Sequence, residues 1–222
     1  MATQGNYETD TNDMRAVHAA LRTSLGAVEA LVAGAGSDPD KVAVVASFYE
    51  NVLEFLHVHH AGEDELVYPV LEERCPQHAD VLTRIHAQHS TLLEPMANAK
   101  AAVAAWQAAP TPEAANAVVH AISAVSDALQ PHLAEEELEV LPIASAYLSP
   151  EEWGALPGHA LRNFACDKPW LALGLVAESL TEDQRAEMLV NMPPPVREMW
   201  TNEWEPAFTG FMSEVRSIPA AS

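Results

Sequence analysis

The fold is decided by two stretches, His59-His60-Ala61-Gly62-Glu63-Asp64-Glu65 and His132-Leu133-Ala134-Glu135-Glu136-Glu137. In each stretch a glutamate follows the first histidine after four residues, and a proline follows that histidine after ten (Pro69 and Pro142). Residues four positions apart lie one above the other on the same face of an α-helix. Each stretch therefore predicts a helix that presents an imidazole and a carboxylate on one side, where both can reach one centre.

A lone histidine precedes each stretch at a nearly equal distance. These histidines are His18 and His89, and each is followed three positions later by a leucine, Leu21 or Leu92. The repeated order of upstream histidine, downstream histidine and glutamate indicates an internal duplication of two helix pairs.

Apolar residues recur at three- and four-residue steps around these motifs, and this period is typical of amphipathic helices. The predicted helices span residues 11–33, 39–66, about 77–106 and about 112–141. Pro95 and Pro131 lie inside the third and fourth helices, where we expect a kink or a short break. Long helices joined by short loops predict an all-α fold, an antiparallel four-helix bundle over residues 11–148.

Residues 149–222 have a different pattern. Ser149 is predicted to cap a short helix that contains Trp153, Thr181 is predicted to cap another, and a last helix follows the prolines at 193–195. We interpret this segment as a C-terminal helical extension that packs its aromatic side chains on the bundle. The alternative is a surface for a partner or ligand formed by Trp200 and Trp204.

The composition excludes several classes of partner. The 222 residues contain 11 lysines and arginines against 32 acidic residues, which gives a formal net charge of −21. Such a surface repels phosphate backbones and anionic lipids, so we expect no nucleic-acid partner and no membrane surface. Two cysteines, a start without a signal-peptide pattern and the lack of a long apolar run predict a cytoplasmic protein without a transmembrane helix.

The motif residues are metal ligands in type and number. They are four imidazoles and two carboxylates: His18, His59, Glu63, His89, His132 and Glu136. Imidazole and carboxylate together are intermediate between soft and hard ligands, and such a set suits iron, manganese or zinc. Without a cation, inward-facing histidines and glutamates would be poorly satisfied. Two carboxylates shared by two histidine pairs predict a dinuclear site with Glu63 and Glu136 as bridges.

These motifs resemble those of the hemerythrin-like family, the His-His-Glu cation-binding domain, over about residues 11–148. The resemblance implies a four-helix bundle that holds a non-haem di-iron centre, that is, two iron ions. It also implies that His18 and His59 hold one iron, that His89 and His132 hold the other, and that both glutamates bridge.

Two further histidines leave alternatives open. The oxygen-carrying members have His-x-x-x-His on the third helix, whereas this chain has His86-Ala87-Gln88-His89, so His86 is either an additional ligand or a group that orients one. His60 is ambiguous in the same way. A register of His60 with Asp64 has the correct spacing, but the duplication favours His59 with Glu63. The remaining histidines are interpreted as core-edge or surface residues: His57, His78, His120 and His159.

Three functions are compatible with this pattern. The first is binding or sensing of O₂ or NO, or a response to redox state. The second is an enzyme that consumes peroxide or nitric oxide, and the third is a structural or storage metal site. The expected partner is therefore a small diatomic or peroxide ligand, and no protein partner is indicated. The high histidine content favours ligand chemistry over iron mineralisation, by analogy with the family.

Overall fold

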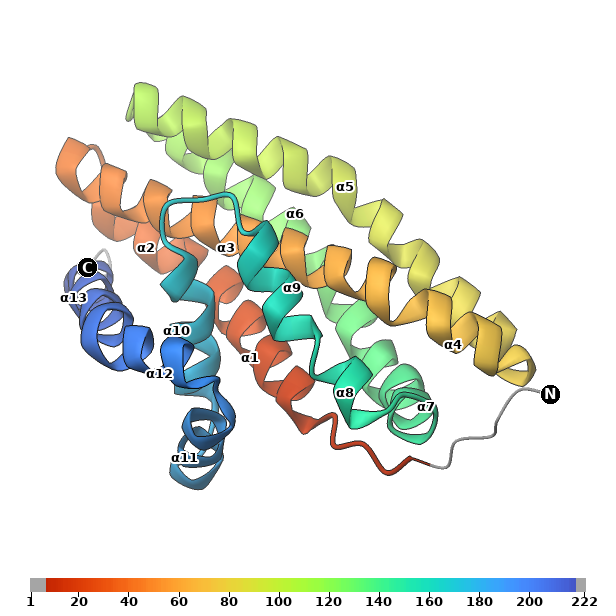
Figure 1. The fold of residues 1–222 in the computed structure, drawn as a ribbon. Helices are drawn as coiled ribbons and strands as arrows, with labels where there is room; N and C mark the ends of the chain where they lie inside the picture. The colour runs from red at the N-terminus through yellow and green to blue at the C-terminus, as the bar shows by residue number, and fades with distance from the viewer. Residues whose placement is uncertain (1–6, 219–222) are drawn as a thin grey trace.

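The computed structural model describes residues 7–218, of which nearly all are helical (Figure 1). Helices make up 87% of the structure, and this confirms the predicted all-α class. The N-terminal residues 1–6, on which the expectation about a signal peptide rests, lie outside the described residues. The helices of the bundle are α1 (Asn12–Gly26), α2 (Val28–Ala35), α3 (Pro39–Leu66), α4 (Tyr68–Arg74), α5 (Ala79–Ala108), α6 (Pro112–Glu135) and α7 (Leu141–Tyr147).

The first predicted helix is two helices, so the prediction of one continuous helix was wrong. The chain bends by 40° between α1 and α2, and Ala27 at the break has φ −81° and ψ −2°. Gly26, a poor helix former, directly precedes it. The bend lets α2 pack on both α3 and α6. Between residues 7 and 218, no single helix is long and apolar enough to cross a membrane, whereas the bent pair α1–α2 passes that test by length and composition alone.

The prolines inside the long helices do not break them. Both α5 and α6 continue past Pro95 and Pro131. The irregularity in the fourth helix lies farther along, in a π-helical turn, η2 (Glu136–Val140), that separates α6 from α7. The second helix follows the prediction, because Pro39 stands in its first turn and the Asp38 carboxylate accepts hydrogen bonds from the next backbone N–H groups.

The interior contains two apolar clusters with a polar layer between them. One cluster follows the length of the bundle and includes Leu21, Leu56, Leu92 and Leu133. The other fills the end near α4 and α7. On each of α1, α3, α5 and α6, the motif residues stand where the first cluster meets the second. The sequence therefore places its histidines and glutamates at one level of the bundle.

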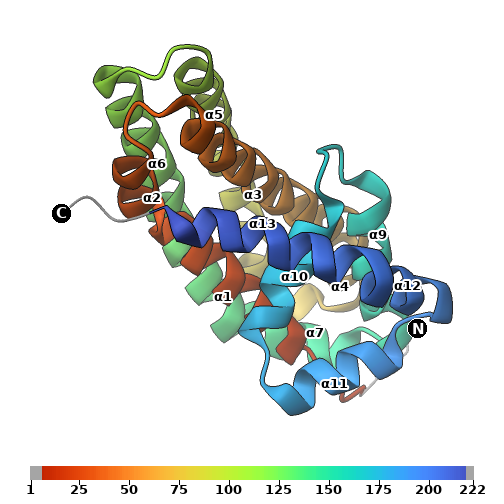
Figure 2. The same cartoon turned by 90° about the vertical axis from the view of Figure 1, so that its left-hand side faces the viewer.

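The C-terminal segment packs on the face of the bundle formed by α1 and α3 (Figure 2). Its elements are α8 (Pro150–Trp153), α9 (Leu156–Asn163), α10 (Pro169–Ser179), α11 (Glu182–Asn191), α12 (Pro194–Met199), η3 (Trp200–Trp204) and α13 (Glu205–Ser217). The capping boxes predicted at Ser149 and Thr181 are present. Trp200 is buried, so it cannot form the partner surface considered above.

Two buried polar side chains of α3 hold the connection between α9 and α10. Glu54 accepts a hydrogen bond from the Ala165 backbone N–H, and Asn51 accepts one from the Lys168 backbone N–H. The Asn51 amide also donates to Asp167. Neither α9 nor α10 was predicted, and α10 is too uniformly apolar for a helical period to stand out.

Candidate metal centre

The six motif histidines and glutamates meet in the polar layer, and His60 joins them. Their donor atoms form two groups in which every atom lies within 4.8 Å of the others. One group is His18, His59, Glu63 and Glu136, and the other is His60, Glu63, His89 and His132. All seven residues are buried. Glu63 belongs to both groups, as a bridging carboxylate would.

The buried donor atoms lack other partners. Five imidazole Nε2 atoms, both oxygens of Glu63 and Oε2 of Glu136 have no hydrogen-bond partner among the described residues. The five rings are those of His18, His59, His60, His89 and His132. Buried polar atoms are nearly always satisfied in folded proteins, and eight orphaned donor atoms at one level need a common partner. A pair of cations fits this set, because neutral imidazole and carboxylate are both cation ligands.

Each glutamate lies between the two duplicated halves. Glu63 Oε1 is 3.6 Å from His59 Nδ1, and Glu63 Oε2 is 3.5 Å from His89 Nε2. Glu136 Oε2 is 3.4 Å from His18 Nε2 and 3.7 Å from His132 Nε2. Both carboxylates therefore contact a histidine of their own half and a histidine of the other half.

Three of the rings are oriented by an acceptor at their other nitrogen. His18 Nδ1 is 2.9 Å from Glu137 Oε1, and His89 Nδ1 is 2.6 Å from Asp64 Oδ1. His132 Nδ1 is 3.0 Å from Gln88 Oε1. An acceptor at Nδ1 keeps the proton there, so the lone pair at Nε2 is free for a metal.

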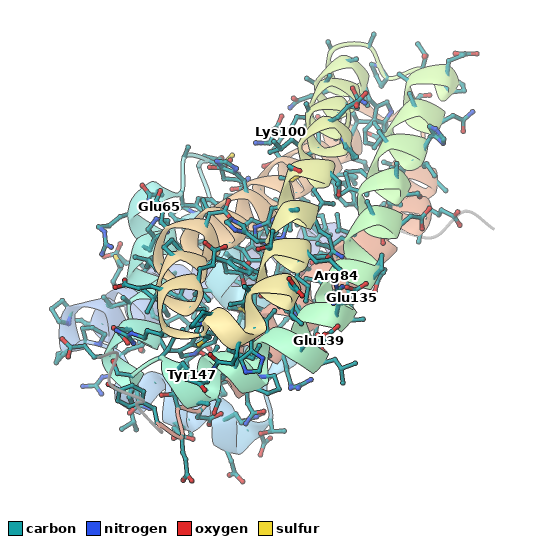
Figure 3. All side chains as sticks on the ribbon, turned by 90° about the vertical axis from the view of Figure 1, so that its right-hand side faces the viewer. Glu65, Arg84, Lys100, Glu135, Glu139 and Tyr147 are labelled. Atoms are coloured by element: carbon teal, nitrogen blue, oxygen red, sulfur yellow. The ribbon has the colours of Figure 1, made fainter. Side chains whose placement is uncertain are left out.

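The Gln88 amide is held on its solvent side by a hydrogen-bond network on the surface of α5, α6 and η2. Gln88 donates to Glu135, which also accepts from Arg84, and Arg84 donates to Glu139 at 2.8 Å. Figure 3 shows Arg84 on α5 reaching toward both glutamates. This network holds α5 against the turn that carries Glu136.

Burial sets the protonation of the histidines. Burial lowers the pKa of His59 and His60 well below the usual value, and neighbouring imidazoles add to the effect. Burial also lowers the pKa of His132 to about 4. For His18, burial opposes the charged form, but the nearby carboxylates of Glu136 and Glu137 outweigh it and raise the pKa. Most of the rings are therefore neutral near pH 7, which is the form that binds metal.

The two glutamates repel one another. Burial and then the charge of Glu136 raise the pKa of Glu63 well above its usual value. Burial opposes ionisation of Glu136 as well, but the adjacent His18 ring lowers the pKa of that carboxyl. A cation placed between the two groups would remove the repulsion and favour both ionised forms.

The two ends of the site differ in access. Glu137, beside His18, is held by Arg22 at 2.7 Å and Arg15 at 3.1 Å. Asp64, beside His89, is exposed and lies on a cavity of about 460 Å³ that also reaches His60. The site is therefore closed on the side of His18 and open on the side of His89.

The other histidines lie outside the two groups. His86 is half-buried at the cavity and contacts Asp64, so Asp64 serves His86 and His89 and does not pair with His60. His57 and His120 are exposed. His159 is buried and its Nε2 is 3.0 Å from Glu65 Oε2.

Sequence reasoning missed the residues that orient the ligands, although one signal was present. Asp64 and Glu137 each stand five positions after the motif histidine and directly after the motif glutamate. Tyr68 was missed as well. Its ring packs edge-to-face on His89 with centroids 5.4 Å apart, and its buried hydroxyl has no hydrogen-bond partner among residues 7–218.

The comparisons agree with the geometry. The family model of the hemerythrin HHE cation-binding domain matches residues 9–144, which include every residue of the two groups. No significant match was found among curated proteins or among solved structures. The match covers more than half of the chain and confirms the resemblance inferred from the motifs. This chain belongs to the hemerythrin HHE cation-binding domain family.

Proposed function

We propose that this protein holds a non-haem di-iron centre that binds or senses O₂ or NO, or responds to redox state. Five imidazoles and two buried carboxylates support this proposal, since intermediate ligands suit iron. Iron would supply a redox-active centre and an open position for a small ligand. The chain's own residues hold the ions, keep Nε2 of each oriented ring free and shield the site from bulk water.

The observation that carries the proposal is the cavity between α3 and α5. Its wall includes His60 and His89, whereas His18 and His59 are absent from its described lining. One group of donors can therefore meet a ligand from solution, and the other is enclosed. A metal that binds a ligand from solution needs a path to solution, and this cavity provides one for the group that contains His60 and His89. The open side supports ligand binding over a purely structural role.

The size of the cavity suits a small ligand. Leu93 and Met96 line it together with imidazole rings and the carboxylates Asp64 and Glu72. O₂ and NO are small and uncharged, so these carboxylates would not repel them on the way to a metal at His60 and His89. We propose these diatomic molecules as ligands, with peroxide as the alternative.

The test is an optical titration of iron-loaded protein with NO under anaerobic conditions, and then with O₂. The expected result is a spectral change that saturates at one ligand per chain and reverses when the gas is removed. A protein that binds iron without responding to NO, O₂ or peroxide would contradict the proposal. Sustained peroxide consumption by iron-loaded protein, without reversible binding, would instead support the alternative function, an enzyme that consumes peroxide.

A pair of variants links the response to the cavity. Ala87 lines the cavity, so Ala87→Trp should fill part of it. Ala104→Trp places the same side chain at an exposed position of α5 outside the described lining. The first variant should slow NO binding and the second should leave it unchanged. Equal rates in both would show that the ligand reaches the metal by another path.

A further inference from the structure

We propose that Asp64, His86 and His89 form an outer site for a divalent cation, through which metal ions are captured before they reach the buried centre. This inference rests on the proposed metal centre, and it assigns the mouth of the cavity a separate function. The donor atoms of these three residues lie within 4.8 Å of one another.

The three residues form a path from solvent to the interior. Asp64 is exposed, His86 is half-buried and His89 is buried. His86 Nε2 is 3.1 Å from Asp64 Oδ1, and all three line the same cavity. An ion bound by Asp64 and His86 would therefore be directly outside the buried group that contains His89.

His86 is held in place, which a histidine on an open surface is not. Its ring stacks on Tyr68 with centroids 4.4 Å apart and an interplanar angle of 7°. Its Nδ1 lies 3.3 Å from Glu72 Oε1. Because Tyr68 is fully buried, it provides a rigid support, and Nε2 of His86 is directed at Asp64.

The charges around His86 call for a cation. A carboxylate lies at each ring nitrogen: Glu72 Oε1 is 3.3 Å from Nδ1, and Asp64 Oδ1 is 3.1 Å from Nε2. The contact at Nδ1 has hydrogen-bond geometry, whereas Nε2 and Asp64 Oδ1 form only a close contact between two possible metal ligands. A divalent ion beside these two atoms would be bound by both.

The second half of the duplication shows which groups lie at the position equivalent to this outer site. Glu137 is the counterpart of Asp64, and the guanidinium groups of Arg15 and Arg22 lie against it. Among the described residues, no lysine or arginine forms an ion pair with Asp64. Arginine side chains thus neutralise Glu137, whereas no such positive charge lies beside Asp64 at the open end of the site.

His89 connects the two sites. Its Nδ1 lies beside Asp64 at the cavity, and its Nε2 lies 3.5 Å from Glu63 in the buried group. An ion held by Asp64 and His86 would therefore lie next to the ring whose Nε2 belongs to the buried group. The net charge of −21 raises the local cation concentration and so supports capture at an outer site.

The experiment measures how fast metal-free protein takes up Co²⁺, whose visible absorption changes on binding imidazole and carboxylate. His86→Phe keeps a ring on Tyr68 and removes the donor nitrogen, and Asp64→Asn removes the charge and keeps an acceptor for His89. His120→Phe on the exposed face of α6 is the control. Both test variants should load at least about tenfold more slowly, taking as a guide the 10–100-fold effect of removing a group beside a metal site, and should still reach two ions per chain at saturating Co²⁺.

A second rate separates cation capture from simple passage through the cavity. NO binding to protein that is already iron-loaded is measured in the same variants and in Ala87→Trp. In His86→Phe, metal loading should slow by a larger factor than NO binding, whereas Ala87→Trp should slow NO binding. Loading at the wild-type rate in both test variants would overturn the proposal, and so would equal slowing of NO binding and metal loading in His86→Phe. A wild-type protein that never binds two ions would contradict the buried centre itself, which is a different result.

Discussion

Asp64 and Glu137 hold equivalent places in the duplicated halves, and each accepts a hydrogen bond from the upstream histidine of the other half. Asp64 Oδ1 is 2.6 Å from His89 Nδ1, and Glu137 Oε1 is 2.9 Å from His18 Nδ1. The halves are therefore interlocked across the site and are not merely side by side. Any ion at this level would join helices from both halves.

Loss of the shared glutamate should affect both metal positions. We expect Glu63→Ala to lower bound metal from two ions to fewer than one per chain, because Glu63 belongs to both donor groups. Glu136→Ala should lose less, since Glu136 belongs to one group. Metal analysis of the purified variants measures this.

The controls for that experiment are Glu54→Ala, His78→Ala and His120→Ala. Glu54 is also a buried glutamate of α3, but it contacts Lys100 and the Ala165 backbone. Metal content equal to that of Glu63→Ala in these controls would refute the ligand assignment.

Removal of His59 and removal of His60 should each lead to the loss of one ion, and the two ions lost should be different. They lie in different groups, and adjacent residues point about 100° apart on a helix. Metal content should fall to about one ion per chain in His59→Ala and in His60→Ala. His57→Ala, exposed on the same helix, should keep both. If His60→Ala retains two ions, His60 is not a ligand and at most orients one.

Glu137 should act on the metal through His18. Its removal leaves Nδ1 of His18 without its acceptor, and loss of such a partner typically weakens metal binding about 10–100-fold. Glu137→Ala should therefore weaken one of the two binding steps in a competition titration with a chelator. Equal weakening of both steps would point to a general loss of folding.

Metal removal should destabilise the bundle without unfolding it. The ligands come from α1, α3, α5, α6 and η2, so the ions bind the assembled fold only. Free metal at 1,000 times its dissociation constant would add about 4 kcal/mol per bound ion to the free energy of unfolding. For a chain of this size that corresponds to roughly 10 °C in Tm for each ion. An unchanged Tm after verified chelation, measured by circular dichroism, would place the ions outside the bundle.

The pair Arg74–Glu152 joins the end of α4 to α8, and it should respond to acid. Hydrogen bonding from Arg74 lowers the pKa of Glu152 to about 2, below the usual 4.5. The stabilisation from this carboxylate is present above pH 4.5 and is lost as the pH falls toward 2. Glu152→Gln should lower the free energy of unfolding by about 1 kcal/mol at pH 7. Urea titrations should show that difference shrinking below pH 4.5, and a constant difference would contradict the ion pair.

The helices and the motif residues could be predicted because both depend on local periodicity. Residues at steps of three and four share a face in any helix, so the inward direction of His59 and Glu63 follows from the sequence. The π turn at Glu136 was not predicted, because the helical period continues through it. The bend at Ala27 was missed although Gly26 precedes it, because the apolar steps continue through Val28 and Leu31. The hydrogen bonds from His18 to Glu137 and from His89 to Asp64 join residues far apart in the chain. The matched positions of Asp64 and Glu137 after the motif glutamates are a signal for their role, but they do not give the partner histidine.

His60 shows a different limit. The duplication favoured His59 because the other half has Leu133 at the equivalent place. Duplicated halves can diverge, and here the half with the open cavity has an additional imidazole while the other has an apolar side chain. Only the positions of all four helices show that one helix contributes to both donor groups.

The central claim is that two iron ions occupy the polar layer of this bundle. The most direct measurement is the metal content of the purified chain, taken with its optical spectrum, for wild type and Glu63→Ala in parallel. We predict two iron ions per wild-type chain with the near-ultraviolet absorption of a coupled iron pair, and loss of both signals in the variant. A wild-type chain that binds no iron when it is supplied, or a variant with unchanged iron and spectrum, would contradict the claim.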